Sequence, residues 1–593
     1  MRRSVGAALV SALTLSTAAS FGLGSAPAGA QSQTKTATEY VVVYRAGASA
    51  AAARAAIKAA GGSIVSERSE IGVAFVKSRR TAFMQVASRA GSVQGVARDR
   101  IIGKAPADAA TSPAAIRDRV EKEGEGTAAA GARTAAPAGS LSDPLSPLQW
   151  DMKMIGATAD GSYAKQLGSK KVLVGIIDTG VDGNHPDIKP NFDAGLSRNF
   201  TTHDPLIDGP CGPATAHPSC GVDPADVDHD GHGTHVASTI GSPLNGLGMA
   251  GVAPNVTLVN VRAGQDSGYF FLKPTIEALM YAADAGIDVV NMSFYTDPWL
   301  YNCGPANPAK WRSNPADPNS PLVAIDSPAE QAEQQTIIDA TNLALNYAHD
   351  KRVTLVSASG NEHTDLGADP KLDQTSPDYP PDTARDRIVS NSCLSMPTEG
   401  DFVLSVNSVG PSGRKADYSN YGIEQTSVAA PGGWYRDGLG TPSYKTKNNL
   451  ILAAYPEAVG RATGKILPDG SIAKGAFVEK DCAGGVCGYY QWIQGTSMAS
   501  PHATGVVALI VSQYGVPDRM HLEGLTMKPS RVERTLYDSA TERDCPEGGI
   551  QSYTDIGRPA DYTAKCVEAG NDFNGFYGHG IVNAAQAVSE GRD

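Results

Sequence analysis

The sequence predicts an α/β protein in which a parallel β-sheet is flanked by helices, preceded by a small α+β domain of ferredoxin-like order. Unbroken apolar runs such as residues 172–177 are typical of strands that are buried on both faces of a sheet. Helical patterns alternate with these runs, which favours parallel connections between the strands. Residues 39–104 show instead the order β-α-β-β-α-β, which is that of the ferredoxin-like motif.

The N-terminal domain is predicted from short β-rich runs with two helical stretches between them. Its expected strands are 40–44, 63–67, 71–77 and 93–98, and its expected helices are 48–60 and 81–90. The first helix is expected to end at Gly61-Gly62, because glycine is common after the last turn of a helix. Residues 105–143 are rich in Ala, Pro, Gly and Thr without a sustained period, so we expect an exposed linker there.

The main domain is expected over residues 144–593, where strand and helix patterns alternate. The expected strands are 172–177, 256–261, 288–292, 354–358 and 403–406, and the expected helices are 233–241, 274–285, 329–349 and 500–514. Three stretches rich in Pro, Gly, Asp and Asn interrupt the alternation, and we interpret them as insertions between core elements. They lie near 295–325, 362–400 and 432–490.

The composition is that of a globular protein with enough apolar material for a core. Of the 593 residues, 41% are hydrophobic and 19% are charged. The formal net charge of −12 argues against nucleic acid or an anionic membrane as a partner, because both are negatively charged. We therefore expect no nucleic-acid partner, and we expect the protein to be a monomer.

The N-terminus has the pattern of a secretory signal peptide. Arg2 and Arg3 precede an apolar run over about 5–23, and Ala28-Gly29-Ala30 supplies a small-x-small cleavage site. A membrane anchor is the alternative, but serine and threonine residues interrupt the apolar run. Residues 1–30 are therefore expected to be removed, which leaves a secreted, extracellular protein without membrane attachment.

All eight cysteines lie after residue 210, and an even number in an exported chain predicts disulfide bonds. Sequence proximity favours three pairs and leaves a fourth. The three are Cys211–Cys220, Cys482–Cys487 and Cys545–Cys566, and the fourth is Cys303–Cys393. The Cys482 and Cys487 pair lies in a Gly-rich turn that could also form a metal knuckle, but no second such pair with histidine occurs.

Several polar segments supply the groups that acyl transfer by serine requires. This chemistry needs a nucleophile, a base, a group that orients the base, and donors for the oxyanion. Ser497 lies among small residues at a predicted strand-to-helix junction, where the helix dipole favours developing negative charge. Asp178 ends an apolar strand, and His232 lies among glycines just before a helix. Asn361 follows another buried strand and is expected to bind the oxyanion together with the backbone N–H of Ser497.

Each segment also has another interpretation. Ser497 is compatible with an ordinary helix N-cap. The Asp-Thr-Gly sequence also occurs in aspartic proteases, which need a second carboxylate, but it is found once here. Five residues could form a metal cluster but lack the spacing of zinc proteases, namely Asp228, His229, Asp230, His232 and His235. The joint order Asp, His, Ser is one of the known orders of the catalytic triad and favours serine catalysis.

The motifs around these residues resemble those of the subtilisin family of serine peptidases, peptidase family S8. The resemblance rests on Asp-Thr-Gly at 178–180, His-Gly-Thr-His-Val-Ala at 232–237, Ser-Gly-Asn at 359–361 and Gly-Thr-Ser-Met-Ala-Ser-Pro-His at 495–502. It implies a subtilisin-like fold and a secreted serine endopeptidase that acts on proteins or peptides. It further implies that residues 39–104 are an inhibitor-type propeptide, which occupies the cleft as an intramolecular inhibitor until it is cleaved off.

The resemblance also implies residues that bind the substrate and a metal ion. Two extended segments would pair with the substrate as added strands, namely Ser267, Gly268 and Tyr269, and Ser293, Phe294 and Tyr295. The family usually has glycine where this chain has Tyr295, so we predict no preferred side chain. Asp187, Asn245 and Gln149 resemble ligands of the family's calcium site, with solvated turn residues as the alternative. Calcium is the expected structural cofactor, and catalysis needs none.

Two other functions are compatible with the same motifs. A catalytically silent binding protein would keep the fold, but the intact triad and Asn361 argue against it. A peptide ligase or an esterase would use the same triad and would differ only in the products that it forms.

Overall fold

The computed structural model describes the chain over seven stretches of sequence. They are residues 37–99, 113–126, 142–211, 221–380, 382–521, 523–570 and 573–589. The predicted signal peptide, residues 1–30, lies outside them. Within these stretches no helix combines the length and the apolar character that crossing a membrane requires.

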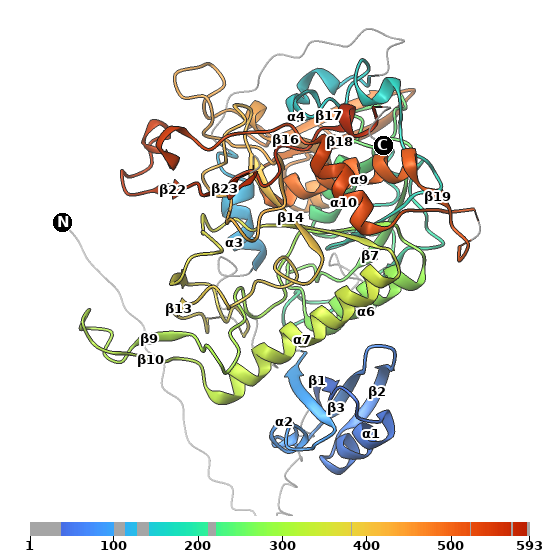
Figure 1. The fold of residues 1–593 in the computed structure, drawn as a ribbon. Coiled ribbons are helices and arrows are strands. Elements are labelled where there is room, and N and C mark those ends of the chain that lie inside the picture. Colours follow the sequence, from blue (N-terminus) through green and yellow to red (C-terminus); the bar gives the residue numbers. More distant parts are fainter. Residues whose placement is uncertain are drawn as a thin grey trace, which may run out of the picture. The chain divides into compact units, whose positions relative to one another are not determined.

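The first described stretch is a four-stranded antiparallel sheet with two helices, shown in blue in Figure 1. Its strands are β1 (Thr38–Tyr44), β2 (Ser63–Arg68), β3 (Val73–Ser78) and β4 (Val93–Arg98), and its helices are α1 (Ala50–Ala59) and α2 (Phe83–Ala87). The strand order β2-β3-β1-β4 and the element order confirm the predicted ferredoxin-like arrangement. Ile57 of α1 and Phe83 of α2 are fully buried with Val42 of the sheet.

The centre of the molecule is a seven-stranded parallel sheet of order β15-β14-β11-β8-β5-β7-β6. The strands are β5 (Leu173–Ile177), β6 (Arg198–Asn199), β7 (Thr257–Arg262), β8 (Val289–Met292), β11 (Thr354–Ala358), β14 (Val403–Val409) and β15 (Val428–Pro431). Every neighbouring pair is parallel. The five predicted strands are confirmed, and the short β6 and β15 add the two edges.

Helices cover both faces of this sheet, as the predicted α/β class requires. The larger ones are α5 (His232–Gly241), α6 (Leu272–Asp284), α7 (Pro328–Asp350), α9 (Thr496–Tyr514) and α10 (Pro529–Ser539). Val174 and Ile176 of β5 pack in a cluster with α5 and α9, whereas Ile177 packs in a second cluster with α6 and α7. Successive side chains of a strand point to opposite faces, so one strand supports both layers.

Two predicted insertions form one structure. β9 (Lys310–Arg312) and β10 (Leu322–Ala324) pair with β13 (Arg387–Val389) and β12 (Lys371–Asp373) in an antiparallel sheet of order β10-β9-β13-β12. The Cys303–Cys393 disulfide joins the two insertions. Arg387, which is fully buried, forms ion pairs with Asp373 over 2.7 Å and with Asp326 over 2.9 Å. The sequence pattern predicts both insertions but not their pairing in one sheet.

The third insertion leads into α9. It contains β16 (Ile451–Ala454), α8 (Glu457–Ala462), β17 (Val478–Ala483) and β18 (Val486–Ile493), and the three strands form an antiparallel sheet of order β16-β18-β17. Shorter elements complete the fold, namely α4 (Trp150–Met154), β19 (Val516–Pro517), β20 (Leu525–Thr526), β21 (Ile550–Ser552), β22 (Thr563–Lys565), β23 (Glu568–Gly570), β24 (Phe573–Asn574) and α11 (Ala584–Ala587).

Three of the predicted cysteine pairs are confirmed as disulfides. They are Cys303–Cys393, Cys482–Cys487 and Cys545–Cys566. Cys482 and Cys487 face each other at the end of the β17–β18 hairpin, so the alternative of a metal knuckle is wrong. The predicted partner of Cys211, Cys220, lies outside the described residues.

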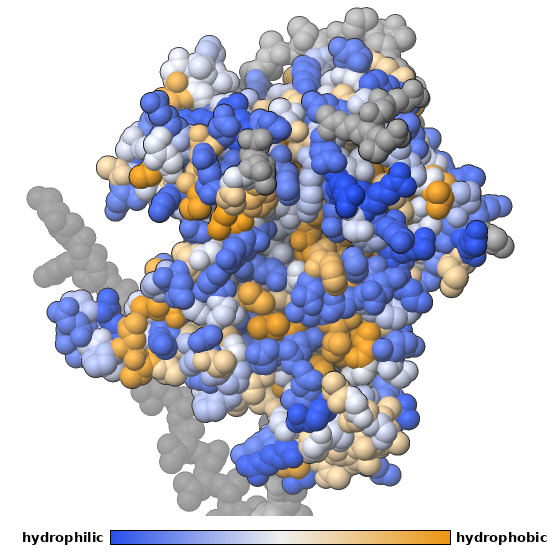
Figure 2. All heavy atoms as spheres, in the orientation of Figure 1, coloured by the Kyte–Doolittle hydropathy of each residue, from blue (hydrophilic) through white to orange (hydrophobic). Residues whose placement is uncertain are grey.

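Polar side chains predominate on the face of the molecule shown in Figure 2. Apolar residues occur there in several separate groups rather than in one continuous band. The apolar side chains of the parallel strands are instead buried in the two clusters described above.

Candidate active site

The aspartate and the histidine predicted for catalysis are in direct contact. Asp178 follows the last residue of β5, and His232 is the first residue of α5. Nδ1 of His232 donates a hydrogen bond to Oδ1 of Asp178 over 2.7 Å. Asp178 is fully buried and His232 is 4% exposed. Because Nδ1 faces Asp178, Nε2 lies on the opposite side of the ring, where a triad histidine exchanges protons with serine.

Close packing of α5 against the end of β5 brings these two residues together. A Cβ atom at Gly233 would lie 2.1 Å from the backbone oxygen of Gly180, so only glycine permits this approach. Asp228 accepts hydrogen bonds from the N–H of Gly231 and from both the N–H and the hydroxyl of Thr234. The carboxylate thus satisfies donors at the start of α5, which fixes the orientation of the helix.

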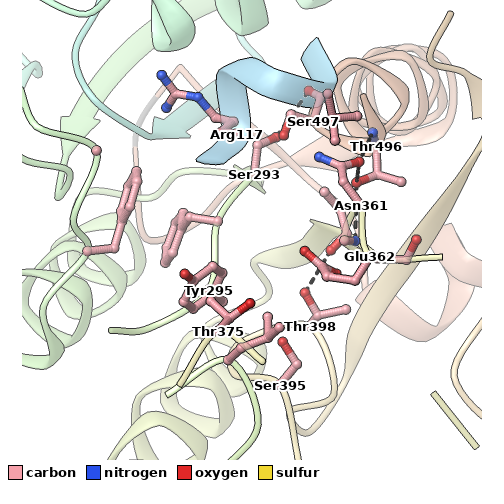
Figure 3. A pocket seen from close by; sticks show the side chains of 18 of the residues that line it. Arg117, Ser293, Tyr295, Asn361, Glu362, Thr375, Ser395, Thr398, Thr496 and Ser497 are labelled. Atoms are coloured by element: carbon pink, nitrogen blue, oxygen red, sulfur yellow. Dashed lines mark hydrogen bonds between the residues drawn. The ribbon is translucent and has the colours of Figure 1, made fainter. Parts of the chain in front are cut away.

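Ser497 and Asn361 approach the same cavity from two other elements. Ser497 lies in the first turn of α9, two residues after Gly495, whose φ of 152° no other residue adopts readily. Oδ1 of Asn361 accepts hydrogen bonds from the N–H and the hydroxyl of Thr496, both over 2.9 Å. The amide nitrogen of Asn361 is therefore left to face the cavity that Ser497 also lines (Figure 3).

A segment that precedes the main domain covers His232. Residues 113–126 contain the helix α3 (Pro113–Glu121), and Glu121 is 1% exposed. Its Oε1 atom lies 3.5 Å from Nε2 of His232. The prediction of an exposed linker at 105–143 is therefore wrong for residues 113–126. The failure has a physical reason: the segment is held by partners far away in the sequence and not by an apolar face of its own.

The charge of His232 is set by its two carboxylate neighbours. Burial alone would lower the pKa of His232, but Asp178 and then Glu121 outweigh that effect and raise the pKa to about 10. The two carboxylates together therefore favour the imidazolium form of His232. An imidazolium cannot accept a further proton, so His232 in that form cannot act as a general base.

Arg117 anchors the same helix beside the site. Its Nη2 atom donates hydrogen bonds to both carboxylate oxygens of Asp230, over 2.9 and 2.8 Å. Its Nε atom lies 3.3 Å from Oε2 of Glu121. Burial acts to raise the pKa of Asp230, but the attraction of Arg117 outweighs it and lowers that pKa. The Arg117 guanidinium therefore connects Glu121 of α3 to Asp230, which lies two residues before the start of α5.

Further contacts hold the rest of the segment along the site. The N–H and side-chain amide of Gln494, which precedes α9, donate to the backbone oxygens of Glu121 and Val120 over 3.0 and 2.9 Å. Nζ of Lys465 donates to Glu125 over 2.7 Å. Gly124 has a φ of 83° and lies so close to the ring of Tyr435 that a Cβ atom would overlap it. The clustered charges at residues 117–125, within an otherwise Ala-rich linker, were the available sequence signal for this role.

The cavity beside Ser497 is lined by four of the six residues expected to bind substrate. They are Gly268, Ser293, Phe294 and Tyr295. The other two do not line it: Ser267 donates to Asp208 over 3.0 Å, and Tyr269 is fully buried against Phe271 and Tyr379. The Tyr295 side chain points toward the second insertion, where its hydroxyl donates to Oδ2 of Asp378 over 2.6 Å.

The sequence profile of the subtilase family, peptidase family S8, matches residues 169–580, which contain Asp178, His232, Asn361 and Ser497. The chain belongs to the subtilase family of serine proteases. Among curated relatives, subtilisin DY of Bacillus licheniformis is 24% identical over 387 residues, which cover 65% of this chain and 88% of that protein. The nisin leader peptide-processing serine protease NisP of Lactococcus lactis is 25% identical over 66% of this chain and 46% of its own length.

Solved subtilase structures confirm the fold. The epidermin leader peptide processing serine protease (EpiP) of Staphylococcus aureus superimposes with a TM-score of 0.56 at 21% identity, covering 94% of this chain and all of that one. Fervidolysin of Fervidobacterium pennivorans, a keratinolytic enzyme, gives a TM-score of 0.52 at 20% identity over 94% of this chain and 61% of its own.

The residues expected to bind calcium do not fit that ion in this subtilase. Oδ1 and Oδ2 of Asp187 accept hydrogen bonds from the Asn245 side chain and the Met249 N–H, over 3.0 and 3.1 Å. Nε2 of Gln149 donates to the backbone oxygen of Ala250. A calcium ion needs six to eight converging oxygens, whereas these oxygens face N–H donors. Burial raises the pKa of Asp187 well above its ordinary value.

The alternative metal cluster around α5 is not formed in this subtilase either. Asp228 caps the helix, Asp230 binds Arg117, and His232 binds Asp178. Nε2 of His235 instead contacts the backbone oxygens of Ile451 and Gln491. Within the seven described stretches no group of three or more His, Cys, Asp or Glu side chains could hold a metal ion.

Proposed function

We propose that this subtilase is a secreted serine endopeptidase that is made as a zymogen. The observation that carries the proposal is the buried Asp178–His232 contact next to a helix start that presents Ser497. In the proposed mechanism Oγ of Ser497 attacks the scissile carbonyl carbon while Nε2 of His232 takes its proton. The acyl-enzyme forms when the C–N bond breaks and the leaving amine receives that proton. Water then attacks the acyl carbon and gives a proton to His232, and the acid product leaves as Ser497 receives that proton.

Asp178 and Asn361 are assigned supporting roles in this mechanism. Asp178 keeps the proton of His232 on Nδ1 and stabilises the imidazolium that forms during attack. The Asn361 amide and the Ser497 N–H would donate to the oxyanion, since Thr496 holds the amide oxygen on the opposite side. In subtilases with this arrangement, loss of one such donor costs on the order of 3 kcal/mol of transition-state stabilisation.

The zymogen part of the proposal rests on the segment 113–126. Glu121 lies beside Nε2 of His232, in the place that the Ser497 hydroxyl would need when a substrate is bound. Arg117 holds the Glu121 carboxylate in that place. The ferredoxin-like domain adds a second attachment, because Arg98 forms an ion pair with Glu333 of α7 over 2.5 Å. Removal of both parts by cleavage after residue 126 would free the cleft, so we propose that maturation cuts within 127–143.

Export is supported by two features. The N-terminal pattern over residues 1–30 is that of a signal peptide, and the described residues contain three disulfides, which persist in oxidising compartments. Curated relatives such as NisP process leader peptides, so proteins or peptides with an accessible extended segment are the proposed substrates.

Labelling with a fluorophosphonate probe tests the proposal on the full-length secreted protein. We expect the wild-type protein to lose its N-terminal domain, to react with the probe at Ser497 and to hydrolyse a casein or peptide substrate. The Ser497→Ala variant should keep the N-terminal domain and remain unlabelled. A folded, processed wild-type protein that neither labels nor hydrolyses any peptide would instead support the silent binding protein, and product analysis with an added amine identifies a ligase.

A further inference from the structure

Beyond the general peptidase reaction, the cavity next to Ser497 has walls that could select a side chain. We propose that it binds a basic side chain, Lys or Arg, of the residue whose carbonyl is attacked. This inference rests on the proposed peptidase function, because the position of Ser497 identifies that residue. Ser497 and Asn361 line the cavity, so the carbonyl would lie at its mouth and the attached side chain would enter it (Figure 3).

The first acidic group of the cavity is Glu362, the residue after Asn361. Its side chain is exposed toward the cavity and lies among the lining residues in Figure 3. Oε2 accepts a hydrogen bond from Nδ2 of Asn420 over 2.6 Å. No Lys, Arg or His of the described stretches forms an ion pair with it. Partial desolvation raises the pKa of Glu362, and the hydrogen bond from Asn420 opposes that effect.

The second acidic group is Asp297, which also lines the cavity and is 3% exposed. It faces Asp378, a residue of the other insertion, which is held by the Tyr295 hydroxyl. Burial and then the Asp378 carboxylate raise the pKa of Asp297 well above its ordinary value. Two carboxyl groups in contact can share one proton, which leaves the pair with one negative charge.

The remaining walls suit the rest of a Lys or Arg side chain. Phe294, Leu300 and Ala358 offer apolar surface, against which the methylene stem can pack. Thr375, Ser395 and Thr398 offer hydroxyls, which can accept hydrogen bonds from an ammonium or a guanidinium. Among the described residues that line the cavity, Arg117 alone is basic, but Asp230 and Glu121 bind its guanidinium. Arg117 also belongs to the segment whose removal we propose.

Peptide substrates that differ only in the residue whose carbonyl is attacked test this inference on the matured enzyme. We expect kcat/KM to be at least about tenfold higher for Arg or Lys than for Gln, Met or Phe at the varied position, since charged hydrogen bonds discriminate at this level. Glu362→Gln should lower the Arg-to-Met ratio of kcat/KM by about tenfold or more, and Asp297→Asn should lower it as well. Fluorophosphonate titration gives the concentration of folded active sites for every variant.

Glu457→Gln is the matched control, because Glu457 is on exposed α8 and pairs with Arg461 over 2.5 Å. It should leave the Arg-to-Met ratio unchanged. A preference of the wild-type enzyme for Met, Phe or Gln, or an unchanged ratio in Glu362→Gln, would overturn the inference. In either case the enzyme still cleaves peptides, so the proposed function stands. Failure of the proposed function has a different result, namely no cleavage of any peptide and no labelling of Ser497.

Discussion

Oε1 of Glu121 lies 3.5 Å from Nε2 of His232, on the side of the imidazole opposite its 2.7 Å hydrogen bond to Asp178. His232 therefore lies between two carboxylates, and only Asp178 belongs to the proposed catalytic triad. In the proposed zymogen, Glu121 occupies the place of the reacting groups and favours the charged imidazole. The segment 113–126 would then act as an inhibitor, and its contribution can be measured residue by residue.

Replacement of Glu121 by Gln should weaken the inhibition. The variant keeps the shape of the side chain but loses the charge that pairs with His232, so self-processing of the full-length protein should be roughly five to ten times faster. Asp118→Asn is the matched control, because Asp118 lies on the same helix and pairs with Lys122 over 2.6 Å. Gel analysis of the processing time course measures both. Equal rates in Glu121→Gln and the unmodified protein would contradict the inhibitory role of this contact.

Inhibition by a synthetic peptide of residues 113–126 should weaken as the pH rises toward 10. The Glu121 carboxylate raises the pKa of His232 in the complex above that in the free enzyme, where Asp178 alone remains. The stabilisation is complete below the pKa of the free enzyme and is lost as the pH rises through about 10, the pKa in the complex. Inhibition constants between pH 6 and 10.5 measure this effect. A peptide with Gln at position 121 should bind more weakly and with less pH dependence.

Asp178→Asn should remove most activity but little stability. The amide keeps the size of the side chain but no longer fixes the proton on Nδ1 of His232, so kcat should fall by about 10⁴-fold. Thermal unfolding should stay within a few degrees of the unmodified protein, and the labelling rate with fluorophosphonate should fall with kcat. A variant with normal kcat would show that another group orients His232.

Lys415 should give the protein a distinct pH dependence of stability. It is fully buried, and Nζ donates to the backbone oxygens of Ala416 and Ser419 over 3.0 and 2.6 Å. Burial lowers the pKa of Lys415 from 10.5 to about 7. Between these values the unfolded chain binds more protons, so the contribution of Lys415 to the free energy of unfolding rises with pH. Denaturant unfolding of Lys415→Met should lack this rise between pH 7 and 10, whereas an equal slope would contradict it.

Calcium should not stabilise the protein through Asp187. Its carboxylate already accepts hydrogen bonds from Asn245 and Met249. The difference between the Tm values measured with calcium and with chelator should therefore be the same for the unmodified protein and for Asp187→Asn. A calcium-dependent Tm increase that Asp187→Asn abolishes would restore this residue as a ligand.

The parallel sheet and the catalytic groups could be predicted because their signals are local. The apolar runs of β5, β7, β8, β11 and β14 identify strands buried on both faces, and Ser497 and His232 lie in segments whose small residues mark helix starts. The pairing of three cysteine pairs followed from proximity and elimination.

Features that depend on distant partners could not be predicted. Glu121 contacts His232, which lies 111 residues later in the chain, and nothing near Glu121 indicates that partner. Tyr295 was known to differ from the family pattern, but its side-chain direction depends on Asp378, 83 residues later. The pairing of β9 with β13 likewise joins two insertions that look separate in the sequence.

The Cys303–Cys393 bond joins the two insertions that supply Tyr295 and Asp297 on one side and Asp378 on the other. The proposed triad lies instead at the end of β5 and at the starts of α5 and α9, which none of the three described disulfides joins. The proposed chemistry and the proposed choice of side chain thus depend on different parts of the chain. Reduction of Cys303–Cys393 should therefore loosen the walls of the cavity while leaving the triad residues in place, so the redox state of this pair would affect selectivity more than the rate of cleavage.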